Sequence, residues 1–123
     1  MKKITLPNTE ISFVKLSSYS GTQTTGEVSE LIGLNQDLKG RNVIILEDII
    51  DTGITLEKIM LLLKKANVAE IKVATLLFKP EAYTKDIPID YIGKSIENKF
   101  VVGYGLDYDE IGRNLPHIYK LIN

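Results

Sequence analysis

The feature that most constrains the fold is a pair of apolar runs separated by an amphipathic helical pattern. Residues 43–46 (VIIL) form the first run, and residues 70–78 (EIKVATLLF) contain the second. The first run is continuous and β-branched, which predicts a central parallel strand covered on both faces. Strand, helix and strand in this order form a βαβ unit with parallel strands. The helical pattern begins near Thr55 and repeats apolar residues at spacings of three and four: Leu56, Ile59, Met60, Leu63 and Ala66.

The remaining sequence predicts short strands and one polar loop within a single α/β domain of residues 1–123. β-forming residues favour strands at residues 11–16, 27–34, 91–92 and 100–102. Residues 17–26 (SSYSGTQTTG) are almost all small or hydroxylated, and such a stretch cannot form a core. We therefore expect a flexible lid loop there. The length suits one domain, and no internal repeat or interdomain linker interrupts it.

The composition excludes several classes of protein. The sequence contains no cysteine, which excludes disulfide scaffolds and thiolate metal sites. Its 15 Lys and Arg residues against 16 Asp and Glu residues lack the basic excess of a nucleic-acid binder. No stretch approaches the roughly 20 apolar residues that span a bilayer, and the first residues lack the apolar region of a signal peptide. We expect a cytoplasmic protein without a nucleic-acid or membrane partner.

A cluster of acids and threonines lies where the first predicted strand meets the helix. In open α/β sheets, ligands bind at this carboxyl edge. Gly53 lets the backbone approach a ligand closely, and the free N–H groups of the first helical turn suit a phosphate monoester. Asp-Thr-Gly alone is more simply a helix N-cap, but capping does not require Glu47 and Asp48. Because acids suit sugar hydroxyls or Mg²⁺, the whole pattern favours a ribose phosphate.

Residues 47–56 (EDIIDTGITL) resemble the 5-phosphoribosyl 1-pyrophosphate (PRPP) signature of type I phosphoribosyltransferases. Further blocks resemble the hypoxanthine-guanine group of that family, in the family's order: LSSY with TQTTG, LLFK, FVVGYGLDY and RNLP. The resemblance implies an open, mostly parallel sheet with flanking helices and a lid. It also implies purine salvage by a Mg²⁺-dependent pentosyltransferase. That enzyme transfers the phosphoribosyl group from PRPP to hypoxanthine or guanine, giving IMP or GMP and pyrophosphate.

The resemblance assigns roles to the residues around the acidic strand end. Glu47 and Asp48 hold the ribose hydroxyls, in part through Mg²⁺, and Asp107 is a further Mg²⁺ ligand. Asp51 is also the catalytic acid or base facing N7 of the purine. The loop that binds the 5′-phosphate comprises Asp51, Thr52, Gly53, Ile54 and Thr55.

By the same resemblance, Lys79 contacts the 6-oxo group, the ring of Phe100 stacks on the purine, and the backbone of Val101 bonds the base edge. Asp107 lies near the base, and the pyrophosphate and lid residues are Ser18, Tyr19 and Arg113. By residue type alone, Lys79 is more often a solvated lysine and Phe100 a core residue. A surface ion pair with Glu110 or Asp109 is the alternative for Asp107 and Arg113.

Family members carry an additional helix, a central strand, a pyrophosphate loop and a second helix at the N-terminus. Residues 1–7 resemble only the end of that second helix and the linker after it. We therefore expect the C-terminal two-thirds of the family fold, with an exposed edge on the strand at residues 43–46. A downstream start, a fragment and a dimer that repairs the edge all remain as explanations. We expect weak binding of PRPP and purine and little turnover. By analogy with the family, we expect a homodimer or homotetramer.

Two other functions are compatible with the same fold. One is a non-catalytic regulatory domain that binds a nucleotide or PRPP, and the other is an orotate- or adenine-type transferase. A regulatory domain has little need for both an acid/base residue and a base-recognition lysine. The joint presence of Asp51, Lys79, Phe100 and Asp107 therefore favours the purine-salvage enzyme.

Overall fold

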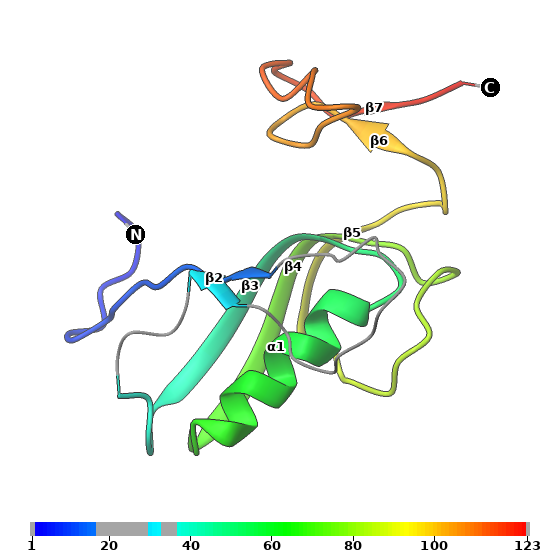
Figure 1. Ribbon diagram of the computed structural model, residues 1–123. Coiled ribbons are helices and arrows are strands. Elements are labelled where there is room, and N and C mark those ends of the chain that lie inside the picture. The colour runs from blue at the N-terminus through cyan, green and yellow to red at the C-terminus, as the bar shows by residue number, and fades with distance from the viewer. Residues whose placement is uncertain (1, 17–29, 33–36, 123) are drawn as a thin grey trace.

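The computed structural model describes residues 2–16, 30–32 and 37–122 (Figure 1). Its centre is a three-stranded sheet in the order β3-β4-β5, formed by β3 (Asn42–Ile50), β4 (Glu70–Phe78) and β5 (Tyr91–Ser95). Helix α1 (Ile54–Lys65) connects the first two strands, which are parallel. The predicted βαβ unit is therefore confirmed. The predicted lid at residues 17–26 lies outside the described residues. The last described residue before it is Leu16, at the end of β1.

The strand register brings the carboxyl ends of the three strands to one edge. Ile50 lies opposite Phe78, and Phe78 lies opposite Ser95. The chain stays paired just past this edge, because Lys79 N–H donates to the Ile50 carbonyl at 3.0 Å. Residues that follow different strands therefore lie close together, as a parallel sheet requires.

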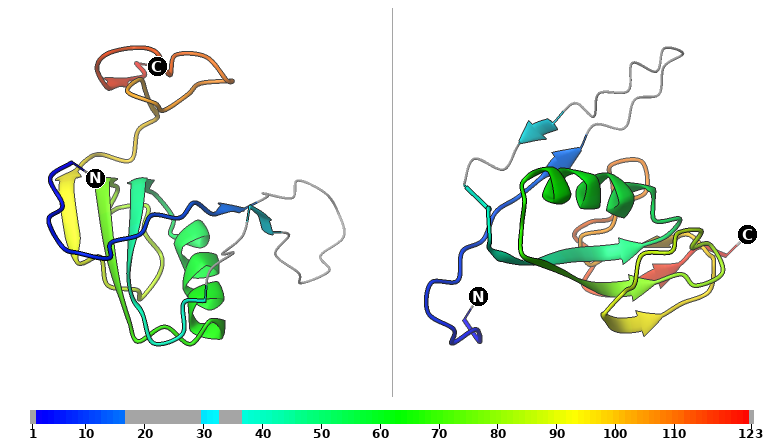
Figure 2. Two further views of the ribbon diagram at one scale, coloured as in Figure 1. Left: turned by 90° about the vertical axis from the view of Figure 1, so that its left-hand side faces the viewer. Right: turned by 90° about the horizontal axis from the view of Figure 1, so that it is seen from below.

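One apolar face of α1 packs on the sheet and forms the core. Leu56 and Leu63 of the helix are buried against Ile45 and Val73 of the strands. Figure 2 shows α1 covering one face of the sheet. Lys64 and Lys65 lie in the last turn, where cations interact favourably with the helix dipole.

The opposite face of the sheet is uncovered within the described residues, so the prediction of a central strand covered on both faces is wrong. β3 is an edge strand, β4 is the central strand, and the side chains of Ile44 and Leu46 are 61% and 71% exposed. An apolar run is typical of a buried strand, but it carries no information about which element covers it. The predicted free edge of β3 is confirmed for the part of the chain that the structure describes.

The shorter strands differ from their predicted bounds. β1 (Lys15–Leu16) pairs antiparallel with β2 (Glu30–Ile32), so no strand forms at residues 11–14. Those residues are largely exposed, and β-propensity alone does not supply a pairing partner. β2 is also shorter than predicted, although residues 27–29 and 33–34 lie outside the description. The N-terminal residues 2–7 form turns and coil rather than the end of a helix.

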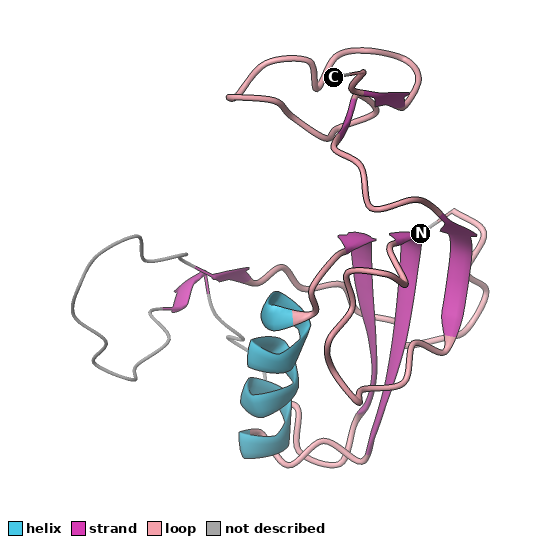
Figure 3. Cartoon of the chain, turned by 90° about the vertical axis from the view of Figure 1, so that its right-hand side faces the viewer, coloured by secondary structure: helices cyan, strands magenta, loops and turns pink. Residues whose placement is uncertain are grey.

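A C-terminal segment, residues 100–122, lies beyond the carboxyl edge of the sheet (Figure 3). It contains β6 (Val101–Val102) and β7 (Tyr119–Lys120), which pair antiparallel. Only β6 was predicted from the sequence. The one helix among the described residues is too short to span a membrane. Phe100, Asp107 and Arg113 belong to this segment, whereas Asp51 and Lys79 lie at the sheet edge that it faces.

Candidate active site

The loop between β3 and α1 leaves the start of the helix open. Gly53 is the N-cap residue in a left-handed conformation, with a φ of 86°, and no side chain caps the first turn. The hydroxyl of Thr52 reaches Ile54 N–H only at 3.5 Å, which is too long for a strong hydrogen bond. The N-cap interpretation of Asp-Thr-Gly is therefore wrong as far as side-chain capping goes. The uncapped N–H groups suit an anion at this position.

Glu47 and Asp48 lie in the last four residues of β3, because the strand extends four residues beyond the predicted run. Glu47 is half-buried, and burial raises the pKa of its carboxyl, with the neighbouring charge of Asp48 as a smaller cause. Asp48 is exposed, and its Oδ1 accepts a hydrogen bond from Ile49 N–H at 2.8 Å. The two carboxylates that were expected to hold the ribose hydroxyls thus lie next to each other near the end of β3.

These two acids fit Mg²⁺ in the way that phosphate-bound magnesium is usually held. Mg²⁺ typically takes one or two carboxylates together with substrate phosphates and water, rather than an all-protein cage. No group of three His, Asp or Glu side chains that could hold a metal occurs among the described residues. Asp107 therefore does not join Glu47 and Asp48 in one cluster here.

Lys79 and Asp51 form an ion pair across the ends of adjacent strands. Lys79 Nζ lies 3.1 Å from Asp51 Oδ2. The side chain of Lys79 is only 8% exposed, whereas that of Asp51 is 48% exposed. A buried ammonium requires such a partner, because burying a charge alone is costly. Lys79 is therefore not the solvated surface lysine of the alternative interpretation.

In the C-terminal segment, Phe100 is 50% exposed and thus is not a core residue. Its ring lies 5.5 Å from that of Tyr108 in an edge-to-face arrangement. Val101 follows in β6 and is half-buried. An exposed ring steadied by a neighbouring ring is compatible with stacking on a flat ligand.

Asp107 and Arg113 bind each other. Arg113 Nη2 lies 2.9 Å from Asp107 Oδ1, and Arg113 Nη1 donates to the Gly105 carbonyl at 2.8 Å. The second carboxylate oxygen of Asp107 accepts Glu110 N–H at 2.9 Å. The ion-pair alternative for Arg113 thus occurs, but with Asp107 rather than Glu110 or Asp109 as the partner.

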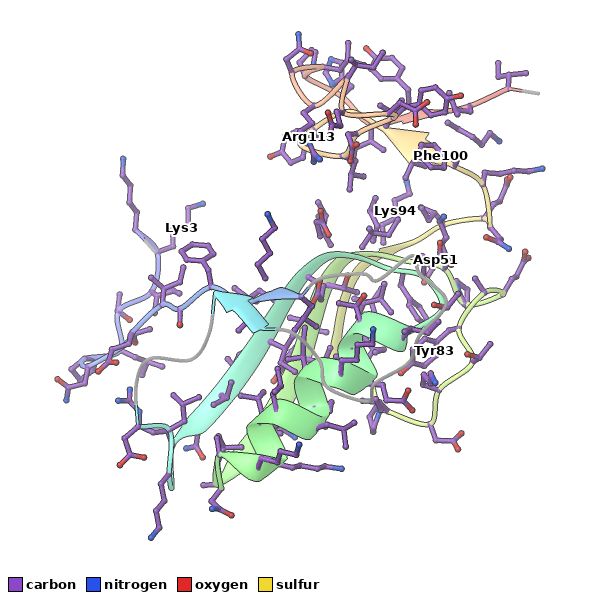
Figure 4. All side chains as sticks on the ribbon, in the orientation of Figure 1. Lys3, Asp51, Tyr83, Lys94, Phe100 and Arg113 are labelled. Carbon is purple, nitrogen blue, oxygen red and sulfur yellow. The ribbon has the colours of Figure 1, made fainter. Side chains whose placement is uncertain are left out.

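The structure gathers the predicted residues into two groups. The first lies at the sheet edge: Glu47, Asp48, Asp51, Thr52, Gly53, Ile54, Thr55 and Lys79. The second lies in the C-terminal segment beyond that edge, as Figure 4 shows for Phe100 and Arg113 relative to Asp51. Ser18 and Tyr19 lie outside the described residues, so their predicted roles remain predictions.

Residues 83–85 also contact the loop after β3, and sequence reasoning missed them. A Cβ on Gly53 would lie 2.5 Å from the Tyr83 ring, and Thr84 donates to the Thr52 carbonyl at 3.2 Å. Lys85 Nζ lies 2.8 Å from Glu57 Oε2 in the first turn of α1. These residues follow Lys79 in an irregular loop, where no periodicity signals a contact.

Residues 2–109 match the family described as "Phosphoribosyl transferase domain". Since the match covers most of the chain, the protein belongs to the phosphoribosyltransferase family. Among curated relatives, the hypoxanthine-guanine phosphoribosyltransferase of Staphylococcus epidermidis is 49% identical over 112 residues. That of Staphylococcus aureus is 47% identical over 112 residues. Each alignment covers 90% of this chain and 63% of the relative, so the chain spans less than two-thirds of their length.

Solved structures give the same result. A hypoxanthine phosphoribosyltransferase from Staphylococcus aureus has a TM-score of 0.79 and 46% identity, over 89% of this chain and 60% of that one. A hypoxanthine-guanine phosphoribosyltransferase from Bacillus anthracis has a TM-score of 0.78 and 40% identity, over 89% of this chain and 65% of that one. The predicted resemblance to the hypoxanthine-guanine group is confirmed, as is the partial span of the fold.

Proposed function

We propose that this chain carries the PRPP- and purine-binding part of a purine-salvage enzyme that converts hypoxanthine or guanine to IMP or GMP. The observation that carries the proposal is the buried ammonium of Lys79, 3.1 Å from the Asp51 carboxylate beside an uncapped helix start. This arrangement supports the proposal because an ammonium, a carboxylate and a loop with uncapped N–H groups lie at one sheet edge. These three groups suit a ribose phosphate joined to a 6-oxopurine.

In this proposal, the loop from Asp51 to Thr55 binds the 5′-phosphate through its N–H groups and threonine hydroxyls. Glu47 and Asp48 hold the ribose 2′- and 3′-hydroxyls and would bind Mg²⁺ together with oxygens of PRPP. Bound Mg²⁺ supplies charge neutralisation for the pyrophosphate as it leaves. Glu47 forms no ion pair among the described residues, and bound Mg²⁺ would supply a cationic partner for its half-buried carboxylate.

The reaction forms the bond from N9 of the purine to C1′ and breaks the bond from C1′ to the pyrophosphate oxygen. Asp51 takes the proton from N7 as the purine becomes bonded, and such general base catalysis is worth about 10²–10⁴ in rate. Lys79 has three N–H donors, so its ammonium can donate to O6 of the base while it keeps Asp51 as a partner.

The C-terminal segment completes the purine site in this proposal. The exposed ring of Phe100 stacks on the base, the backbone of Val101 bonds the base edge, and Asp107 contributes near the base and the metal. Arg113 binds oxygens of the pyrophosphate, and Ser18 and Tyr19 belong to the lid. We also propose a cytoplasmic location and a homodimer or homotetramer, by analogy with the relatives.

Titration calorimetry tests the proposal. Mg²⁺ with PRPP should bind the chain, guanine should bind only after PRPP, and turnover should be low. Lys79→Met should abolish the guanine step while it preserves PRPP binding, because it removes the donor to O6 and the ion pair with Asp51 but none of the groups proposed to contact PRPP. Efficient release of pyrophosphate by the 123-residue chain would contradict the expectation of low turnover.

The same titration separates the alternative function, a regulatory domain that binds PRPP or a nucleotide. Such a domain would bind PRPP with no effect of guanine, and Lys79→Met would change nothing. Failure of PRPP to bind at all would contradict both functions.

A further inference from the structure

The loop after β4 holds the phosphate-binding loop in place through Thr84. Both the backbone N–H and the hydroxyl of Thr84 donate to the carbonyl oxygen of Thr52, each at 3.2 Å. Thr52 lies in the middle of the turn between β3 and α1. One carbonyl of the turn is therefore fixed by two donors from a segment more than thirty residues later in the sequence.

Fixing that carbonyl also fixes the next amide. A trans peptide unit is planar, and its C=O and N–H bonds point in opposite directions. Because the Thr52 carbonyl points toward Thr84, Gly53 N–H points away from the loop after β4. The first turn of α1, which begins at the next residue, has no side-chain cap.

Thr84 is itself held by its neighbours on both sides. Tyr83 donates its hydroxyl to the Ile87 carbonyl at 2.6 Å, and its ring packs edge-to-face on Phe78 at 5.3 Å. Lys85 pairs with Glu57 in the first turn of α1 at 2.8 Å. Two anchors, one on β4 and one on α1, thus determine where Thr84 meets Thr52.

We propose that Thr84 is a positioning residue that turns the Gly53 amide toward the phosphate of the substrate. The inference rests on the proposed function, since it assigns a purpose to the phosphate-binding loop. Thr84 does not touch the phosphate. It acts by orienting the peptide between Thr52 and Gly53 before the ligand arrives, which lowers the cost of ordering that peptide on binding.

The test uses the full 123-residue chain, with ribose 5-phosphate as the probe. Thr84→Val removes the hydroxyl donor at nearly constant volume, and Thr84→Ser retains it. Thr84→Val should raise the Kd about 2- to 10-fold, the range expected for one net hydrogen bond, and Thr84→Ser should restore it. The matched control is Thr9→Val, because the Thr9 hydroxyl donates to the Leu6 carbonyl at 2.8 Å in the exposed N-terminal segment.

A role limited to stability would change the unfolding free energy and leave the Kd of the folded protein unchanged. Equal Kd values for the wild-type chain and Thr84→Val, or no rescue by Thr84→Ser, would therefore overturn the proposal. A ligand-free measurement separates this outcome from failure of the proposed function. The NMR signal of the Gly53 amide should shift in Thr84→Val and return in Thr84→Ser. If the wild-type chain did not bind ribose 5-phosphate, the proposed function would fail. Independently of that result, a Gly53 signal that Thr84→Val left unchanged would overturn the positioning role.

Discussion

At the scale of single residues, the turn at Gly53 combines two constraints that only glycine satisfies. Its φ of 86° is left-handed, and a Cβ would lie 2.5 Å from the Tyr83 ring. Gly53→Ala should therefore lower the unfolding free energy by roughly 1–3 kcal/mol, measured by urea denaturation. Gly40→Ala is a matched control, since Gly40 has a φ of 72° and nothing within 4 Å of a Cβ. Equal losses in both variants would show that the Tyr83 contact adds nothing.

The half-buried carboxyl of Glu47 makes stability depend on pH. Its pKa in the folded protein is raised above the usual 4.5, chiefly by burial and then by the charge of Asp48. The folded state therefore binds this proton more tightly than the unfolded state does. The resulting stability is complete below pH 4.5 and is lost as pH rises through the raised pKa.

Glu47→Gln removes this titration. The variant should become more stable than the wild-type chain as pH rises from 4.5 toward neutrality, and it should bind Mg²⁺ less tightly. Urea denaturation at several pH values measures the difference, with the exposed Glu81→Gln as the control. A stability difference that did not vary with pH would contradict the prediction.

At the scale of elements, a side chain extends the pairing of β4 with β5. Asp90, just before β5, accepts Val73 N–H through Oδ2 at 2.7 Å, and its own N–H donates to the Val73 carbonyl at 3.0 Å. Asp90→Ala leaves the amide of a buried residue without its acceptor, which should cost about 1–3 kcal/mol of unfolding free energy.

Asp90→Asn retains an acceptor oxygen and should recover part of this loss in urea denaturation. Asp86→Ala, an exposed acid in the same loop, controls for the loss of charge. If Asp90→Asn were as unstable as Asp90→Ala, the charge pair with Lys72 at 3.6 Å would be the larger contribution.

At the scale of the whole molecule, the two faces of the sheet differ in what covers them. Leu63 of α1 is 3% exposed on the covered face, whereas Leu46 is 71% exposed on the other. Leu63→Ala should cost about 2–5 kcal/mol because it leaves a cavity, and Leu46→Ala should cost less than about 0.5 kcal/mol. Urea denaturation compares the same substitution at the two positions. A large, concentration-dependent loss at Leu46 would show that this face is covered in solution by another chain.

Much of the site could be predicted from the sequence because its residues are local. Acids, glycine and threonines within residues 47–55 follow one strand and precede one helix, so strand direction and helix start suffice to bring them together. Lys79 follows the next strand, and the parallel register places it at the same edge. Secondary-structure propensity could not predict the partner of Lys79. The burial of Lys79 and its pairing with Asp51 depend on the packing of two strand ends.

The sequence by itself determined the βαβ unit, the position of the turn between β3 and α1, and the family. These features depend on short-range periodicity and on motifs whose members are neighbours in the chain. Only the tertiary structure decided that Lys79 is buried and pairs with Asp51, that Asp107 pairs with Arg113, and that Thr84 holds the Thr52 carbonyl. Each of these depends on which distant segment lies alongside, and a local pattern of residues carries no information about its neighbours in space.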